Sequence, residues 1–174
     1  IVDKNKLIKH NVGIYLQDIP TDELSGLSSI PHEEAENRGY FKIDFLNLNI
    51  YKNVRDEEHL LCLMETEPYW EILEEKTIIE ELFQISNHYE IVSHYKPTSI
   101  DQLAMVLAMI RPAKAHLIGE PWDIVEKEVW TKIDNGKYSF KKSHAIAYAM
   151  VIVVQMNLLM EQCCEDERSM SAVA

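Results

Sequence analysis

The stretch AIAYAMVIVVQMNLLM, residues 145–160, is the longest apolar run in the chain and decides how the chain folds. It is short for a membrane span, which takes about 20 apolar residues. Gln155 and Asn157 interrupt it, and amide side chains are costly inside lipid. We therefore predict a buried helix in a protein core, capped by Ser143 and ending at about Gln162, and no membrane contact.

Two strands are predicted upstream of this helix. Residues 11–17 are apolar and rich in residues that favour strands. Residues 40–45 alternate between apolar and polar types, which is typical of a half-buried strand. The alternation puts five side chains on two faces: Phe41, Ile43 and Phe45 on one, Lys42 and Asp44 on the other.

Several helices are predicted after residue 57. The clearest runs from Ser99 to Ile110, where Ser99 and Gln102 form a capping-box pattern and Pro112 ends the helix. A second helix opens at Pro121 and ends at Asn135-Gly136. Apolar residues among the acids of residues 60–83 indicate one or two amphipathic helices. Strands early and helices later make this an α+β protein.

The charge of the chain is concentrated in one window. The 174 residues include 29 acids against 17 Lys and Arg, a net charge of −12. Asp56 to Glu81 holds ten acids and a single cation, Lys76, so this window alone carries −9. Such a run is usually a solvated face. The overall acidity argues against binding nucleic acid through bulk positive charge, although the rest of the chain is close to neutral.

Common active-site signatures are absent from the sequence. It has no nucleophile elbow, Walker loop, dinucleotide-binding glycine motif or zinc-protease motif. Its three cysteines form no C-x-x-C pair, which argues against structural zinc and a disulfide scaffold and favours a cytoplasmic protein with free thiols. Asp44 beside Lys42 could present a carboxylate for two-metal chemistry. Alternatively, the two form a solvent-facing pair on an edge strand, which the local pattern alone favours.

Five segments together resemble the bacterial replicative DNA polymerases of family C, the DNA polymerase III alpha subunits. They occur in the order of that family and span roughly residues 10 to 160. The family's motifs are an H-x-x-G strand, K-x-D-F-L-G-L, F-Q-L-E-S, a helix ending in A-L-x-R-P-G, and F-N-K-S-H-A-A-A-Y-A. The matching segments here are residues 10–16 (HNVGIYL), 40–48 (YFKIDFLNL), 82–86 (LFQIS), 99–112 (SIDQLAMVLAMIRP) and 140–149 (FKKSHAIAYA).

The resemblance implies roles for particular residues. Asp44 matches the third catalytic carboxylate of the family's palm, so we expect it to be catalytic and to bind magnesium. Lys42 matches the neighbouring lysine, which could neutralise phosphate. The other expected contacts to DNA or nucleotide lie on the later motifs: Arg111, Lys141, Lys142 and His144.

The sequence also departs from the family. The family's paired aspartates, D-x-D, are missing from this chain, and Ala113 replaces the glycine of R-P-G. Only 27 residues separate Pro112 from Phe140, where the family has a long fingers segment. One carboxylate cannot hold two magnesium ions, so we expect no polymerase activity from this chain alone. The shortened motifs suggest a phage or prophage version.

The resemblance predicts a partial palm-like segment over residues 1–55 and a helical fingers-like segment over residues 56–174. The expected activity is magnesium-dependent transfer of a deoxynucleotide from dNTP to a primer 3′-hydroxyl. Expected partners are primer–template DNA and an upstream segment or second polymerase chain that carries the other aspartates. The alternative is a non-catalytic, polymerase-derived protein whose acidic stretch contacts a basic replication partner.

Overall fold

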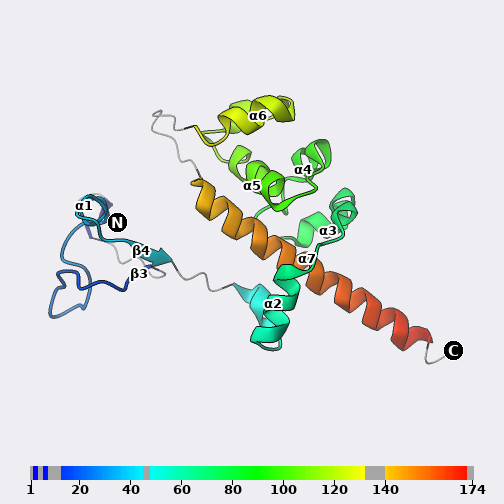
Figure 1. The fold of residues 1–174 in the computed structure, drawn as a ribbon, viewed down its shortest axis with the longest axis horizontal. Helices are drawn as coiled ribbons and strands as arrows, with labels where there is room; N and C mark the ends of the chain where they lie inside the picture. The colour runs from blue at the N-terminus through cyan, green and yellow to red at the C-terminus, as the bar shows by residue number, and fades with distance from the viewer. Residues whose placement is uncertain (1, 4–5, 8–12, 45–47, 132–139, 172–174) are drawn as a thin grey trace. The chain divides into compact units, whose positions relative to one another are not determined.

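A computed structural model gives the fold in two compact units, Ile1–Tyr51 and Lys52–Ala174 (Figure 1). The structure describes residues 2–3, 6–7, 13–44, 48–131 and 140–171; for residues 2–3, 6–7, 44 and 165–171 it describes the backbone. We predicted a boundary between residues 55 and 56. Each unit is described by itself.

The first unit is built around two antiparallel ribbons. In the second ribbon, Ile14 lies opposite Ile43. Both predicted strands are therefore confirmed over shorter ranges, although Phe41 is more exposed than expected and Phe45 lies outside the described residues. The elements are β1 (Val2–Asp3), β2 (Lys6–Leu7), β3 (Gly13–Tyr15), α1 (His32–Asn37), β4 (Lys42–Asp44) and the 3-10 helix η1 (Asn49–Asn53), which reaches into the second unit.

The second unit is helical and holds the main hydrophobic core. Together with the ribbons of the first unit, it makes the chain an α+β protein, as predicted. Its helices are α2 (Glu57–Glu65), η2 (Trp70–Glu74), α3 (Lys76–Glu81), α4 (Tyr89–Tyr95), α5 (Ile100–Met109), η3 (Ala115–Leu117), α6 (Trp122–Glu128) and α7 (Lys142–Ser171).

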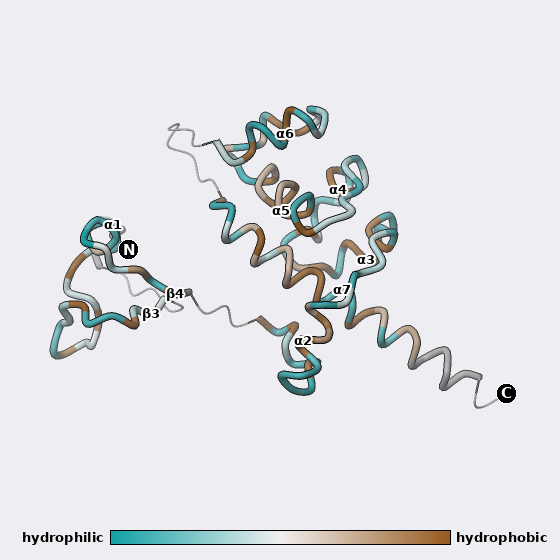
Figure 2. Tube along the Cα trace, viewed as in Figure 1, coloured by the Kyte–Doolittle hydropathy of each residue, from teal (hydrophilic) through white to brown (hydrophobic). Residues whose placement is uncertain are grey.

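Helix α7 is the central element of the second unit. It packs most extensively against α5 and also against α2, and Figure 1 shows these helices along its length. Ala145, Ala149, Ile152 and Met156 are fully buried, as the spacing of one helical face requires. Figure 2 shows the same segment as hydrophobic, like α5 beside it. The apolar run is therefore a core helix of this unit.

The two amides in the apolar run are bound by other elements. The Asn157 Nδ2 atom donates to the carbonyl oxygens of Leu63 and Thr66, at 2.8 and 2.9 Å. The Gln155 side chain donates to the Glu81 carbonyl and accepts from the Phe83 N–H, at 2.7 and 2.9 Å. Since carbonyls at helix ends lack partners within their own helix, these amides join α2 and α3 to α7.

Helix α7 also meets the criteria for a membrane span by length and composition. Its stretch Lys142–Cys164 is long and apolar enough, and half of the apolar window is buried inside the protein. The core helix of a globular protein meets the same criteria. The predicted lack of membrane contact stays a prediction.

Helix boundaries differ from the predictions at several points. The Ser99 hydroxyl caps α5 as expected, but Gln102 accepts from the Thr98 N–H rather than completing the box on Ser99. Helix α7 begins at Lys142, so the prediction of Ser143 as its cap was wrong, and the Ala145 N–H already bonds to the Lys141 carbonyl. The helix also continues beyond Gln162, to Ser171.

The acidic window lies on the surface. All ten acids between Asp56 and Glu81 are exposed, which confirms a solvated face. Asp56 caps α2 by accepting from the His59 N–H at 2.8 Å. Glu74 and Glu80 form ion pairs with Lys96 and Lys76.

Candidate functional site

Asp44 ends strand β4, and its backbone lies opposite Gly13 of β3. Its carboxylate lies outside what the structure describes. Lys42, two residues earlier, lies opposite Tyr15 and is half-buried. Both residues therefore lie on a strand, as predicted. Their roles in binding metal and phosphate stay predictions.

A metal site needs more than Asp44. The residues of β3 that face β4 across the ribbon are Gly13, Ile14 and Tyr15, so the partner strand offers no second carboxylate. Within the described residues, no three His, Cys, Asp or Glu side chains are grouped so that they could hold a metal ion. Magnesium, which prefers several oxygen ligands, does not fit the described residues alone.

Arg111 is the centre of a side-chain cluster in the second unit. It follows the last turn of α5, and its Nη2 atom donates to Gln84 Oε1. Its guanidinium carbon lies 4.7 Å from the centre of the Phe140 ring, a cation–π distance. Its Nε atom is buried and has no hydrogen-bond partner within the described residues. The guanidinium group is thus contacted by Gln84 through a hydrogen bond and by Phe140 through its ring.

Aromatic rings extend the cluster along the first turns of α7. The Phe140 ring centre lies 5.1 Å from that of Tyr148 and 6.4 Å from that of His144. Tyr148 in turn stacks on Phe83 at 5.4 Å. Since Phe83 and Gln84 are neighbours in sequence, one segment contacts both Tyr148 and Arg111.

Gln84 has an unusual backbone. Its φ of +65° is in the left-handed region, which side chains other than glycine rarely adopt. Such a conformation costs about 1–2 kcal/mol. Residues held in this way are enriched at functional sites. Here the conformation accompanies a side chain that accepts a hydrogen bond from Arg111.

The pKa of His88 is affected by the charge of Arg111. Burial, and after it the positive charge of Arg111, lower the pKa of the His88 imidazole below its ordinary value. A neutral imidazole near a permanent cation avoids repulsion between like charges. The lowered pKa makes the half-buried His88 imidazole less easily protonated than an exposed one.

The start of α7 carries exposed cations. Lys141, Lys142 and His144 are all exposed. The Lys142 Nζ atom lies 3.8 Å from Asp101 Oδ1 and 5.9 Å from the centre of the Trp130 ring. The N-terminus of a helix is also its positive end, because its first N–H groups lack helical partners. This end of the helix therefore favours anions.

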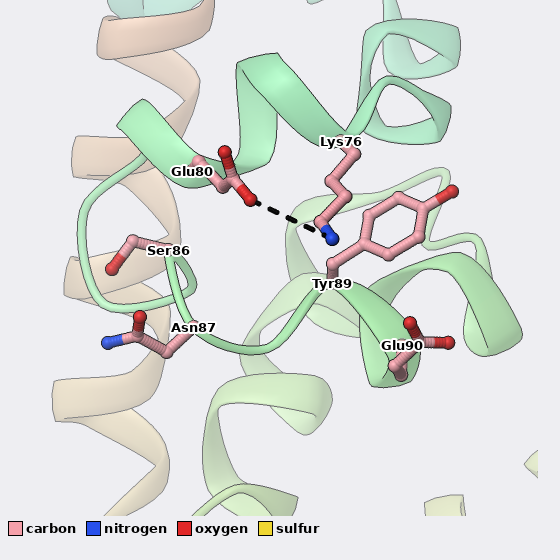
Figure 3. Close-up of a pocket in the computed structure, with 6 residues that line it drawn as sticks. All are labelled: Lys76, Glu80, Ser86, Asn87, Tyr89 and Glu90. Carbon is pink, nitrogen blue, oxygen red and sulfur yellow. Dashed lines mark ion pairs between the residues drawn. The ribbon is translucent and has the colours of Figure 1, made fainter.

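The described part of the chain also has a polar pocket of about 350 Å³. Figure 3 shows Lys76 reaching toward Glu80, 4.0 Å away, and beside the Tyr89 ring. None of the predicted site residues lines this pocket, whose walls are Lys76, Glu80, Ser86, Asn87, Tyr89 and Glu90.

Two of the six predicted site residues, Arg111 and His144, lie in this cluster through their contacts with Phe140. Lys141 and Lys142 directly follow Phe140 in the sequence, and Lys142 contacts Asp101 and Trp130. Lys42 and Asp44 belong to the other unit. The sequence arguments missed three contributors: Gln84, Phe140 and His88. Gln84 and Phe140 lie inside two of the segments that resemble the polymerase family, and that resemblance implies no role for either.

No protein-family model, no curated protein and no solved structure matches this chain.

Proposed function

We propose that this chain is the palm-and-fingers portion of a family C DNA polymerase. It would act in the transfer of a deoxynucleotide from dNTP to a primer 3′-hydroxyl. The observation that carries the proposal is the convergence on Arg111 of three segments that resemble the family: residues 82–86, 99–112 and 140–149. The Gln84 side chain of the first segment and the Phe140 ring of the third both contact Arg111 of the second.

The chemistry of the cluster suits phosphate. A guanidinium stays charged at all working pH values, and its N–H groups donate charge-assisted hydrogen bonds to phosphate oxygens. Lys141 and Lys142 add exposed ammonium groups at the positive end of α7. These groups would position DNA or the triphosphate electrostatically. The Phe140 ring orients the guanidinium plane and limits its movement.

The other half of the proposal concerns Asp44. We assign it as one carboxylate of the magnesium site and Lys42 as a phosphate neighbour. The described residues do not complete that site, so an upstream segment or a second chain has to supply the other carboxylates. Magnesium is the proposed cofactor of that assembled enzyme. Alone, this chain is expected to be inactive.

Primer extension tests the assignment of Asp44. The chain is combined with an upstream segment or partner chain that carries the paired aspartates, and the wild type is compared with Asp44→Ala. Loss of a metal-binding carboxylate should remove activity almost completely. Asp18→Ala is the matched control, because Asp18 is an exposed acid of the same unit. Equal extension by wild type and Asp44→Ala would refute the role of Asp44.

A second candidate is a non-catalytic binding protein derived from such a polymerase. The exposure of all ten acids in the window from Asp56 to Glu81 favours it. Binding to primer–template DNA that falls steeply with added salt would count against this candidate, because steep salt dependence reports phosphate contacts.

A further inference from the structure

Helix α2 exposes two large apolar side chains among carboxylates. Leu61 is 51% exposed and Met64 is 37% exposed. They are three residues apart and therefore neighbours on the helix surface. Glu57 and Glu58 lie one turn before Leu61, and Glu65 lies one turn after it. We call these five residues the α2 face.

The orientation of α2 is fixed by contacts on its other side. His59 is buried, and its Nε2 atom lies 3.0 Å from Glu161 Oε2 of α7. Leu63 is buried as well, and its carbonyl accepts from Asn157. Leu61 and Met64 cannot turn inward without breaking these contacts. Their exposure is therefore a property of the packed unit.

The carboxylates of the α2 face are not paired with a cation of the described residues, and the neighbouring Arg55 lies 3.9 Å from Glu161 instead. Glu57, Glu58 and Glu65 form no ion pair within the described residues. The sequence from Asp56 to Glu75 contains no Lys or Arg. Exposed ammonium or guanidinium groups of a partner would thus find uncompensated negative charge around an apolar centre.

Charge also decides between possible occupants. A second copy of this chain would bring an equally acidic surface, and like charges placed together are costly. Nucleic acids and anionic membranes are repelled for the same reason. A basic protein segment is attracted. An amphipathic helix presents cations beside an apolar stripe, which matches the pattern of the α2 face.

We propose that the α2 face is a docking surface for a basic amphipathic helix of a partner protein. Apolar side chains of the partner cover Leu61 and Met64, while its Lys and Arg side chains pair with Glu57, Glu58 and Glu65. The site does not depend on the polymerase proposal, because it uses none of the residues around Arg111 or Asp44.

The test measures binding of a labelled peptide to the full chain by fluorescence anisotropy. The probe is a peptide of about 18 leucine and lysine residues with leucine at helical spacing, long enough to form a helix. A scrambled peptide of the same composition is its control. The wild type should bind the amphipathic peptide at least about tenfold more tightly than the scrambled one, which is about 1.4 kcal/mol.

A double variant tests the apolar residues of the α2 face, and a triple variant tests its carboxylates. Leu61→Ser with Met64→Ser should abolish the preference for the amphipathic peptide, whereas Ile118→Ser, another exposed apolar residue of this unit, should retain it. The triple change Glu57→Gln, Glu58→Gln and Glu65→Gln should weaken binding and flatten its salt dependence. The matched triple change of exposed acids elsewhere, Glu90→Gln, Glu120→Gln and Glu126→Gln, should have a smaller effect.

Three results would overturn the proposal. The first is equal affinity for the amphipathic and scrambled peptides. The second is an unchanged preference in the Leu61→Ser, Met64→Ser variant, provided that circular dichroism shows an intact helical fold. The third is a dimer of the wild type in sedimentation that this variant abolishes, because the occupant would then be a second copy.

Discussion

Gln84 keeps a left-handed backbone while its side chain accepts a hydrogen bond from Arg111. The sequence identifies this residue as part of a motif, yet nothing in its letters reveals a positive φ, which depends on how α3 and the following turn meet the core. Arg111 could be predicted because its motif is distinctive. Its contact with Phe140 could not, because 28 positions separate the two residues in sequence.

The strain at Gln84 is open to direct measurement. Gln84→Gly and Gln84→Ala both remove the side chain that accepts from Arg111, but only glycine relieves the left-handed backbone. Gln84→Gly should therefore be more stable than Gln84→Ala by about 1 kcal/mol in urea unfolding. Equal stability of the two variants would show that the backbone at Gln84 is unstrained.

His88 makes the stability of the protein depend on pH. Its pKa is lower in the folded protein than its ordinary value of 6.5, so the unfolded chain binds more protons in the interval between the two values. Stability is therefore lost as the pH falls from about 6.5 toward the folded-state pKa, and none of this penalty remains above that interval. His88→Gln should show a shallower loss of the free energy of unfolding over this range. Parallel curves for the two proteins would contradict the assignment.

At the scale of elements, α7 was the most predictable part of the fold and also the part with the largest boundary error. Its apolar run and the two amides correctly indicated a core helix. Its start was misplaced because Ser143 is a good cap in general, whereas the chain enters the helix one residue before it. The acidic window divides into α2, η2 and α3, since Pro68 and the buried Leu73 and Ile79 follow no single helical period.

The amide of Asn157 should contribute more to stability than its small size suggests. Asn157→Ala leaves the buried carbonyl of Leu63 and the partly buried carbonyl of Thr66 without their donor, and an unsatisfied buried group costs about 1–3 kcal/mol. Asn87→Ala, at an exposed asparagine, is the matched control and should change the free energy of unfolding by less than about 0.5 kcal/mol. Similar losses in both variants would argue against this connection between α2 and α7.

At the scale of the whole molecule, the two units differ in how much hydrophobic core stabilises them. Every residue of the main core cluster lies in the second unit, from Leu73 to Met156. In the first unit, Ile19 and Ala35 are the buried apolar residues among those described. Two-stranded ribbons are marginally stable by themselves. The α+β class followed from the sequence pattern, but this unequal division of the core did not, because periodicity does not reveal which elements pack together.

The second unit should fold alone. A fragment of residues 52–174 is expected to unfold cooperatively in urea, with a midpoint close to that of the full chain. A fragment of residues 1–51 should lack a cooperative transition. An unfolded 52–174 fragment would mean that the first unit supplies essential packing.

Binding to primer–template DNA at increasing salt tests the central claim, that the cluster around Arg111 and the start of α7 handles DNA. We expect binding at low salt, with an affinity that falls steeply as salt is added. The double change Lys141→Ala and Lys142→Ala should weaken binding and reduce the salt slope by about 2 if, as proposed, each lysine contacts one phosphate. Lys52→Ala with Lys127→Ala, at exposed lysines outside the cluster, should leave the slope unchanged. No binding at low salt, or equal slopes for all these proteins, would contradict the account.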